Sequence, residues 1–427
     1  MHPDEPEEWD GDGEIAHPLP KDLMFDHWTT LSSGDLASFS ETITKQVITA
    51  LGPAGRKPRA DLVKGIGDIV PTIIANLLLL HRGRPDGSRL VVQMERRKNT
   101  RYDRKGFRKL PEVVNAMAAL GHLIKHRAVF KQKRTTIEAT GDLKHALQAP
   151  GIPLSVIDRT AGEEVIHLTA RPSVRRIAGR KQPKTLVDYD DTEETIALKQ
   201  EMEEINRFLA SRSIKLEGAS QPAFRLTRRF TLRSPDDPHE FEAHGRLYGG
   251  FWMTLKASER HRIRVDGEPV ADLDFASMFP RLAYLAVGQL PPEGDLYALP
   301  GLEGHRDGAK AGLSALLSYP SKMKSLPPRL KQMLPEGWTA SRLRRALAAH
   351  HPHLVPFFEK DFGLDLMFTE SRILLTAMRQ LMEQDIPALP MHDGMMVPRS
   401  KVDSAVQAMR HASEKVTGFP IPVSLKV

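Results

Sequence analysis

The sequence predicts an α+β fold, in which a mostly helical N-terminal region precedes a C-terminal region of mixed strands and helices. Two observations support this prediction. In the first hundred residues, apolar side chains recur at helical spacing, at Leu62, Ile66, Ile69, Ile73 and Leu77. From about residue 225 onward, aromatic residues alternate with arginines and glycines, which is typical of hairpin strands. With 427 residues, the chain is long enough for two or three domains with substantial cores.

The composition is that of an ordinary globular protein with a basic surface. The net charge of +7 and the pI near 9.4 favour a polyanionic partner such as nucleic acid, although a solvated basic surface gives the same balance. The absence of cysteine excludes disulfides, Cys-ligated zinc and thiol catalysis, and it suits a cytoplasmic location. The longest apolar run, residues 69–80, contains Pro71 and Asn76 and is too short to span a bilayer. We therefore expect no membrane partner, and the acidic N-terminus does not resemble a signal peptide.

Residues 1–20 combine acids with proline and glycine, and we expect them to form a disordered tail. Residues 21–170 are expected to form a helical region that binds DNA. Within it, a basic loop with aromatic residues at 99–109 leads into a helix at 111–120 that Gly121 closes. Two strand-like runs follow, at 123–130 and 135–140, and a basic tip at 131–134 separates them.

A helix beside a hairpin with a basic tip is the winged-helix arrangement, which would put the helix in a groove and the tip on phosphates. A small α+β module with a charged hairpin would give the same pattern. The nucleic-acid contacts expected from this region are Arg101, Arg104, Lys105, Arg108, Lys131, Lys133 and Arg134.

Residues 171–224 are predicted to form a basic linker followed by a helix from about Thr192 to Ser211. Asp191-Thr192-Glu193 resembles the metal-binding DxE of proofreading exonucleases. Asp191 can equally cap the helix, with Glu194 three positions on as in a capping box. Because no matching acidic motifs follow downstream, we expect the cap.

Beyond residue 225, the interleaving of arginines with aromatic residues suits single-strand or primer-template contacts. An ordinary aromatic sheet core would account for the aromatic residues equally well. The expected nucleic-acid contacts here are Arg228, Arg229 and Arg246.

Two short segments place carboxylates at the edge of strand-like apolar runs. In the first, Asp266-Gly267 is a turn signal, and the strand that follows sends Asp272 and Asp274 to one face, where one or both could bind a metal. In the second, residues 389–398, two short strands joined at His392-Asp393-Gly394 push Asp393 to a hairpin tip, and Pro398 stops the second strand. Together the segments could hold two divalent ions, the arrangement that joins nucleotides by in-line phosphoryl transfer.

The first segment resembles motif A of palm-domain DNA polymerases. Asp274, Phe275 and Arg281 match the family A form, Asp-Tyr-Ser-Gln-Ile-Glu-Leu-Arg, whereas Asp274, Ser277, Phe279 and Pro280 match the family B form. His392-Asp393 is similar to the His-Asp of family A DNA polymerases and of single-subunit phage-type RNA polymerases. Gly394 stands where family A usually has Glu. The resemblance covers about residues 225–427 and implies a palm and fingers domain there, with 171–224 as a candidate thumb.

Between the two segments, Arg306 and Lys310 lie four positions apart and hence on one helix face. They resemble the fingers helix of family A, in which an Arg-x-x-x-Lys pair is followed by Tyr-Gly. The resemblance implies that Arg306 and Lys310 neutralise the incoming triphosphate and that Tyr319 stacks near the nascent base pair. Tyr319 falls one residue later than the family spacing, and Pro320 replaces the glycine.

The resemblance implies a template-directed DNA polymerase that extends a primer 3′ end by two-metal phosphoryl transfer. Asp274 and Asp393, with Asp272 as a further candidate, would hold two Mg²⁺ ions, for which Mn²⁺ could substitute. His392 would contact the primer end, and Arg281 belongs to the expected nucleotide-binding set. Phe279 lies five residues after Asp274, where both families place the side chain that blocks a ribose 2′-hydroxyl, although it could also be a core aromatic. The expected partners are a DNA primer-template and dNTPs.

Three alternatives stay open. An RNA polymerase or primase-polymerase could use the same palm and would extend with NTPs. A non-catalytic winged-helix replication initiator would need no metal carboxylates. A metal nuclease would use paired carboxylates to cleave phosphodiesters. The template type, primer requirement, processivity, pathway, oligomeric state and protein partners are not specified by the sequence.

Overall fold

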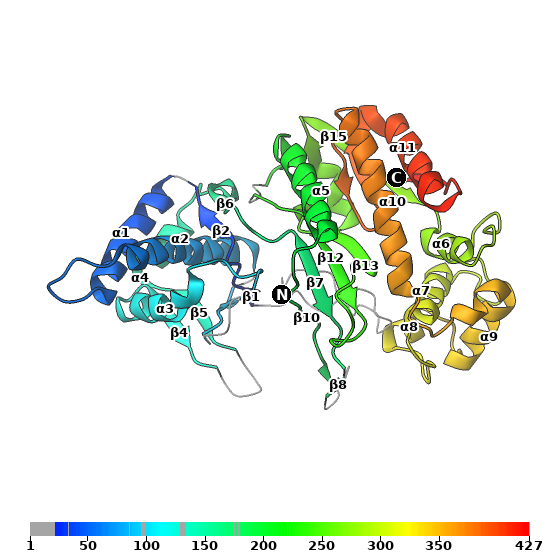
Figure 1. Ribbon diagram of the computed structural model, residues 1–427, viewed down its shortest axis with the longest axis horizontal. Coiled ribbons are helices and arrows are strands. Elements are labelled where there is room, and N and C mark those ends of the chain that lie inside the picture. The colour runs from blue at the N-terminus through cyan, green and yellow to red at the C-terminus, as the bar shows by residue number, and fades with distance from the viewer. Residues whose placement is uncertain are drawn as a thin grey trace. The chain divides into compact units, whose positions relative to one another are not determined.

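The computed structural model describes residues 22–32, 34–84, 86–94, 100–128, 134–173, 176–177, 180–219, 221 and 223–426. These residues fall into two compact units (Figure 1). The N-terminal unit comprises residues 22–164 and 218–225, and the C-terminal unit comprises residues 165–217 and 226–426. Helices and sheets are mixed in both units, consistent with an α+β fold.

The N-terminal unit is built around one long apolar helix. Its helices are α1 (Asp35–Leu51), α2 (Ala60–Gly83), α3 (Leu110–Ala119) and α4 (Gly141–Gln148). Its main sheet has the order β1 (Leu23–Met24), β3 (Leu90–Val91), β5 (Thr136–Ala139) and β4 (Leu123–His126), and β2 (Thr29–Leu31) pairs with β6 (Ile157–Arg159). The length and composition of α2 would suffice to cross a membrane, but 61% of its most apolar stretch is buried inside the protein, as in a core helix.

The predicted helix and hairpin of this unit exist as α3 and as the antiparallel pair β4 and β5. Residues 129–133, which include most of the predicted basic tip, lie outside the described residues. The winged-helix interpretation therefore stays a prediction.

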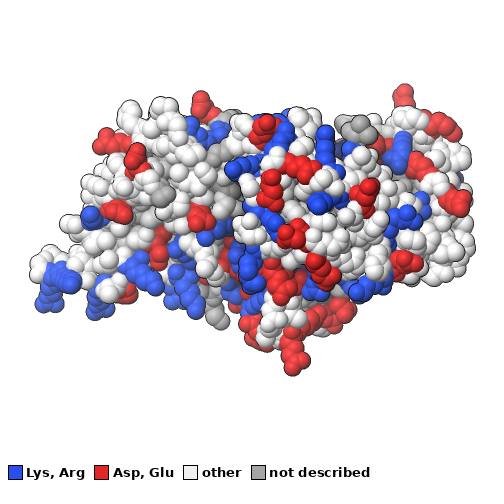
Figure 2. Space-filling view, turned by 90° about the horizontal axis from the view of Figure 1, so that it is seen from above, with Lys and Arg blue, Asp and Glu red and all other residues white. Residues whose placement is uncertain are grey.

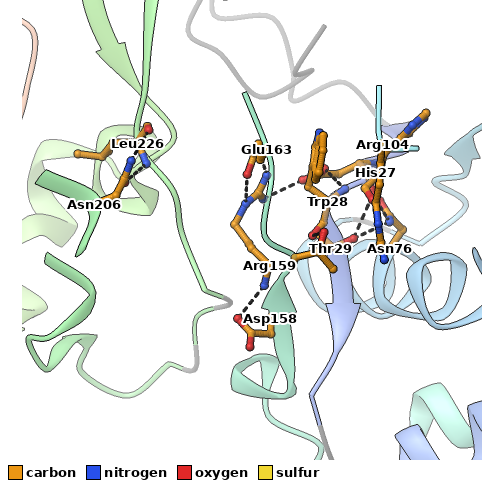
Figure 3. Close-up of polar contacts among 12 residues, drawn as sticks. His27, Trp28, Thr29, Asn76, Arg104, Asp158, Arg159, Glu163, Asn206 and Leu226 are labelled. Atoms are coloured by element: carbon orange, nitrogen blue, oxygen red, sulfur yellow. Dashed lines mark hydrogen bonds and ion pairs between the residues drawn. The ribbon is translucent and has the colours of Figure 1, made fainter. Parts of the chain in front are cut away.

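Polar contacts tie the first described residues to α2 (Figure 3). Asn76 is fully buried, and its amide nitrogen donates to the carbonyl of Asp26 at 2.9 Å and to the hydroxyl of Thr29 at 2.8 Å. Its amide oxygen accepts the N–H of Asp26 at 2.8 Å. A buried amide in an apolar helix is stable only when its donors and acceptor are bonded in this way.

The C-terminal unit contains two larger sheets. One has the order β10 (Thr185–Leu186), β7 (Ile166–Ala170), β12 (Thr227–Leu232) and β13 (His244–Tyr248). The other runs β11 (Ile214–Leu216), β14 (Ile263–Val265), β15 (Glu268–Phe275), β17 (Gly394–Pro398) and β16 (Leu389–Pro390), and β18 (Val423–Lys426) pairs with the C-terminal half of β15. A two-stranded ribbon joins β8 (Arg176–Ile177) and β9 (Arg180–Lys181).

Helices of the C-terminal unit pack against these sheets and against each other (Figure 1). The helix α10 packs against β13, α6, α7 and α11, and α11 also contacts β15, β17 and β18. The helices are α5 (Glu193–Ala210), α6 (Met278–Ala286), α7 (Arg306–Ser318), α8 (Pro328–Gln332), α9 (Ala340–His350), α10 (Gly363–Glu383) and α11 (Val402–Thr417).

Local signals account for the strand that carries the first carboxylates. Asp266 and Gly267 both have positive φ, 52° and 85°, and they join β14 to β15 with Val265 directly opposite Glu268. This is the two-residue hairpin turn that Asp-Gly favours. The cap of α5 differs from the prediction by one residue. Thr192 and Thr195 form the capping box, and Asp191 instead pairs with Lys199 at 2.6 Å.

Candidate active site around Asp274 and Asp393

The fold brings Asp274 and Asp393 together from distant parts of the chain. Strands β15 and β17 are antiparallel, and Asp274 stands opposite Gly394. The N–H of Phe275 donates to the carbonyl of Asp393 at 3.0 Å, which holds the hairpin tip against the end of β15. The carboxylate near the C-terminal end of β15 therefore lies beside the one in the turn before β17.

Gly394 permits this close approach. A Cβ atom at residue 394 would lie 2.1 Å from the carbonyl oxygen of Leu273 and 2.7 Å from Oδ1 of Asp274. No side chain fits there without moving the strands apart. The glutamate that the resemblance would place at this position is therefore sterically excluded in this fold.

Burial and mutual repulsion shape the ionisation of the pair. The Asp274 side chain is 16% exposed, and burial together with the negative charge of Asp393 raises the pKa of Asp274 to about 7. Burial also acts to raise the pKa of Asp393, but the charges of Lys310, Lys426 and Arg246 outweigh it and hold that pKa below its usual value. The pair thus attracts a proton or another cation near neutral pH.

One oxygen of Asp274 is left without a donor. Oδ2 accepts a hydrogen bond from the ammonium of Lys426 at 2.8 Å. Oδ1 is buried and accepts no hydrogen bond from any residue that the structure describes. A buried carboxylate oxygen in that state is costly unless a ligand completes it.

An ion pair between β13 and α10 carries charge close to the carboxylates. Arg246 donates to Glu370 through Nε at 2.7 Å and Nη2 at 3.1 Å. Glu370 is 1% exposed, and burial raises its pKa to about 7 even though Arg246 opposes the shift. The guanidinium of Arg246, expected on nucleic acid, is thus held by a protein carboxylate, and its charge acts on Asp393.

The two basic residues predicted on one helix face have different surroundings. Lys310 is exposed on α7, and its charge helps to lower the pKa of Asp393. Arg306 instead donates to Asp295 at 2.6 and 2.9 Å and lies 5.1 Å from the centre of the Tyr297 ring. Tyr297 is buried, and burial together with the charge of Asp393 raises its pKa.

His392 lies beside a polar aromatic group on β13. Its ring centre is 5.9 Å from that of Tyr248, whose hydroxyl is hydrogen-bonded to His244 Nε2 at 3.2 Å. The guanidinium carbon of Arg229 lies 4.7 Å from the centre of the Tyr248 ring. Tyr248 is buried, so the end of β13 packs beneath the hairpin tip that carries His392.

The remaining predicted nucleotide and metal residues are spread around this centre. Asp272 lies on the same strand face as Asp274, but its carboxylate pairs with Arg260 at 3.0 Å. Arg281 is buried and donates to the carbonyls of Ala276 and Gly294 at 3.0 and 3.2 Å, an arrangement that favours a structural role. Phe279 lies half-buried in the first turn of α6, and Tyr319 lies half-buried at the C-terminal end of α7.

Several arginines expected on nucleic acid are turned into the protein. Arg228 has a side chain that is 4% exposed, pairs with Glu201 at 3.1 Å and donates to the carbonyl of Gly245. In the N-terminal unit, Arg101 pairs with Glu164 and Arg104 pairs with Asp68. These contacts favour structural roles for the three arginines.

Other basic residues of the N-terminal unit stay at the surface. Lys105, Arg108 and Arg134 are exposed, whereas Lys131 and Lys133 lie outside the described residues. Figure 2 shows lysine and arginine side chains gathered along one edge of this unit, whereas acidic and basic side chains are mixed over the C-terminal unit.

Four residues that border the carboxylates were missed from sequence: Lys426, Glu370, Tyr297 and Arg260. None of them belongs to a recognisable motif. The sequence indicates a strand at 423–426 and an apolar helix around Glu370. Neither pattern shows which strand or helix these segments pack against.

Asp274 and Asp393 are the side chains that could hold a metal ion. No group of three or more His, Asp or Glu side chains converges among the described residues. Two carboxylates nevertheless suit Mg²⁺, which prefers oxygen ligands and completes its shell with waters and substrate phosphates. The unbonded Oδ1 of Asp274 fits that role.

Comparisons with known proteins identify no family for this chain. No family model matches the chain, and no curated protein matches it. Among solved structures, it is similar to the POL domain of Pol1 from M. smegmatis in complex with DNA primer-template and dNTP, with 13% identity and a TM-score of 0.25 over 54% of this chain and 50% of that chain. The chain thus matches about half the length of that relative. A likeness of this size assigns neither fold nor function.

Proposed function

We propose that this protein is a template-directed nucleic-acid polymerase, and specifically a DNA polymerase that extends a primer with deoxynucleotides. The observation that carries the proposal is the juxtaposition of Asp274 on β15 with Asp393 at the tip between β16 and β17, with Lys310 close enough to influence Asp393. Strand-borne carboxylates beside a helix-borne cation are the parts that phosphoryl transfer needs.

In this proposal, Asp274 and Asp393 hold two divalent ions, which when bound would activate the primer 3′-hydroxyl and stabilise the leaving pyrophosphate. Asp393 is suited to the task because neighbouring cations keep it ionised. Lys310 is exposed and positioned to neutralise phosphate oxygens of the incoming nucleotide.

The surrounding residues receive supporting roles. Arg246 and Glu370 hold charge beside the carboxylates on the rigid pair β13 and α10. His392, which packs against the buried ring of Tyr248, would contact the primer end. Phe279, in the first turn of α6, would exclude a ribose 2′-hydroxyl and thereby favour dNTPs. Arg306, paired with Asp295, would need to exchange that partner to reach a phosphate.

The proposed architecture follows from these roles. The sheet of β15, β16 and β17 with α10 and α11 forms a palm, α6 to α9 form compact fingers, and α5 belongs to a candidate thumb within residues 171–224.

The N-terminal unit would bind the nucleic acid outside the reaction centre. Two basic segments meet there, because Lys109 pairs with Asp61 at the start of α2 at 3.6 Å. The surface lysines and arginines of the two segments are Arg56, Lys57, Arg59, Lys64, Lys105 and Arg108. A cationic face of this kind suits a phosphate backbone. The same cationic face supports a second candidate function, that of a non-catalytic replication initiator, because an initiator would need only this DNA-binding face.

The test is primer extension by purified Asp393→Ala, with Asp403→Ala as the matched control because Asp403 is an exposed aspartate on α11. We expect extension to fall by about 10³-fold or more in Asp393→Ala, because losing several kcal/mol of transition-state stabilisation has that effect. DNA binding, measured by fluorescence anisotropy, should persist.

Running the assay with dNTPs and NTPs on DNA and RNA templates separates the alternatives. Unchanged extension by Asp393→Ala would refute the catalytic assignment. Efficient extension with NTPs by the unaltered protein would favour an RNA polymerase or primase-polymerase. Magnesium-dependent degradation of the primer without incorporation would favour a nuclease.

A further inference from the structure

Lys426 contacts the carboxylate that we propose as a metal ligand. Strand β18 pairs with β15 so that Lys426 stands opposite Asp272, which shares a strand face with Asp274. The ammonium of Lys426 donates to Oδ2 of Asp274 at 2.8 Å. A divalent ion on the unbonded Oδ1 of Asp274 would bring its charge beside this ammonium, and the two cations would repel each other.

The surroundings of Lys426 favour its charged form. Its ammonium donates to the carboxylate of Asp274, and its strand position faces Asp272 on β15. The side chain is nevertheless 46% exposed. It can therefore swing into water without disrupting the pairing of β18 with β15.

We propose that Lys426 is a resident counter-ion of the carboxylate pair, and that its ammonium leaves Oδ2 of Asp274 because a divalent ion bound at Oδ1 repels it. The inference rests on the proposed function, because it assumes that Asp274 and Asp393 bind the ion. In the metal-free protein the ammonium offsets the repulsion between the two carboxylates. It also lowers the affinity of the site for a free divalent ion, since displacing it breaks an ion pair.

The experiment measures Mn²⁺ binding to metal-stripped protein, without nucleotide, from the electron paramagnetic resonance signal of free Mn²⁺. Lys426→Met keeps the length of the side chain and removes its charge. We expect it to bind Mn²⁺ about threefold more tightly than the unaltered protein, since a factor of three is about 0.7 kcal/mol, within the range for a partly exposed ion pair. Lys426→Arg keeps the charge and should bind as the unaltered protein does.

Two controls locate the effect. Lys215→Met changes an exposed lysine on β11 of the same sheet and should leave Mn²⁺ affinity unchanged. Adding Asp393→Asn to Lys426→Met should abolish the gain, because the ion would lose its second carboxylate. A gain that survives this addition places the ion elsewhere and overturns the proposal.

Unchanged affinity in Lys426→Met would also overturn it. Weaker binding would do the same, because it would mean that the lysine orients Asp274 for the ion. None of these results depends on the outcome of primer extension by Asp393→Ala, so failure of this inference is distinguishable from failure of the proposed function.

Discussion

A buried charge cluster in the N-terminal unit and the carboxylate pair in the C-terminal unit differ in how completely their atoms are bonded. Arg159 lies between Asp26 and Glu163 and donates to Glu163 through Nε at 2.8 Å and through Nη2, and to Asp26 through Nη1 at 2.9 Å (Figure 3). Asp274 and Asp393 are two neighbouring carboxyl groups, and Oδ1 of Asp274 accepts no hydrogen bond from the described part of the chain.

This difference indicates that the Arg159 cluster is structural and that the Asp274–Asp393 pair is a candidate active site. Burial acts to lower the pKa of Arg159, but the charges of Asp26 and Glu163 outweigh it and raise that pKa, so the fold favours the charged guanidinium. Burial raises the pKa of Glu163, although Arg159 opposes that shift. For Asp274, burial and the charge of Asp393 raise the pKa to about 7, so the fold holds the pair against repulsion. A buried carboxylate with a raised pKa is typical of a site that binds a metal or substrate.

The largest expected effect on stability comes from breaking the bonded cluster. Arg159→Ala leaves Asp26 and Glu163 buried without their cation and should lower the free energy of unfolding by about 3–5 kcal/mol. Urea denaturation measures it, with Arg56→Ala as an exposed-arginine control. A loss below about 1 kcal/mol, the value for a surface ion pair, would show that the cluster does not hold the unit together.

The next effect concerns the glycine that lets the carboxylates meet. Gly394→Ala places a Cβ against the Leu273 carbonyl and should cost about 1–3 kcal/mol as overpacking, together with much of the primer-extension activity. Gly67→Ala is the contrast in the N-terminal unit. A Cβ at this exposed position in α2 meets nothing within 4 Å, so it should stabilise by about 0.5–1 kcal/mol. Equal effects of the two substitutions would contradict the close approach at Gly394.

The smallest expected effect tests whether the ionised carboxylate of Asp274 destabilises the folded protein. In metal-free buffer at pH 8, Asp274→Asn should raise the free energy of unfolding by about 1 kcal/mol, because it removes a carboxylate whose ionised form the fold disfavours.

The raised pKa of Asp274 determines how the stability gain of Asp274→Asn depends on pH. The folded protein binds this proton more tightly than the unfolded chain, so the stability that the protonated carboxyl contributes is complete below pH 3.8 and is lost as pH rises through about 7. The advantage of Asn over Asp should therefore be small at pH 4 and full above pH 7. A gain that does not change between pH 4 and pH 8, or a loss at pH 8, would contradict the assignment.

Local signals allowed much of the candidate site to be predicted from sequence. The Asp-Gly turn, the alternation along β15 and the short strands around His392 each follow from a few neighbouring residues. The proximity of Asp274 and Asp393 required only that their two strands pair. By contrast, Lys426 and Glu370 reach the site through pairing and packing between segments far apart in the chain, for which the sequence carries no local mark.

Charge patterning alone was less informative in the N-terminal unit. Nucleic-acid contacts were expected from the basic loop at 99–109, yet Arg101 and Arg104 pair with Glu164 and Asp68. Which arginine meets a carboxylate depends on the path of other segments. The winged-helix interpretation and the nucleic-acid contacts of this unit stay predictions.

Divalent-ion binding should differ between two variants, one from each cluster. Mn²⁺ is titrated into folded Asp393→Asn and Asp26→Asn in the presence of a dideoxy-terminated primer-template and the matching dNTP. We predict that Asp393→Asn loses the bound Mn²⁺ and that Asp26→Asn retains it. Retention of Mn²⁺ by Asp393→Asn would contradict the assignment of the carboxylate pair as the metal-binding centre.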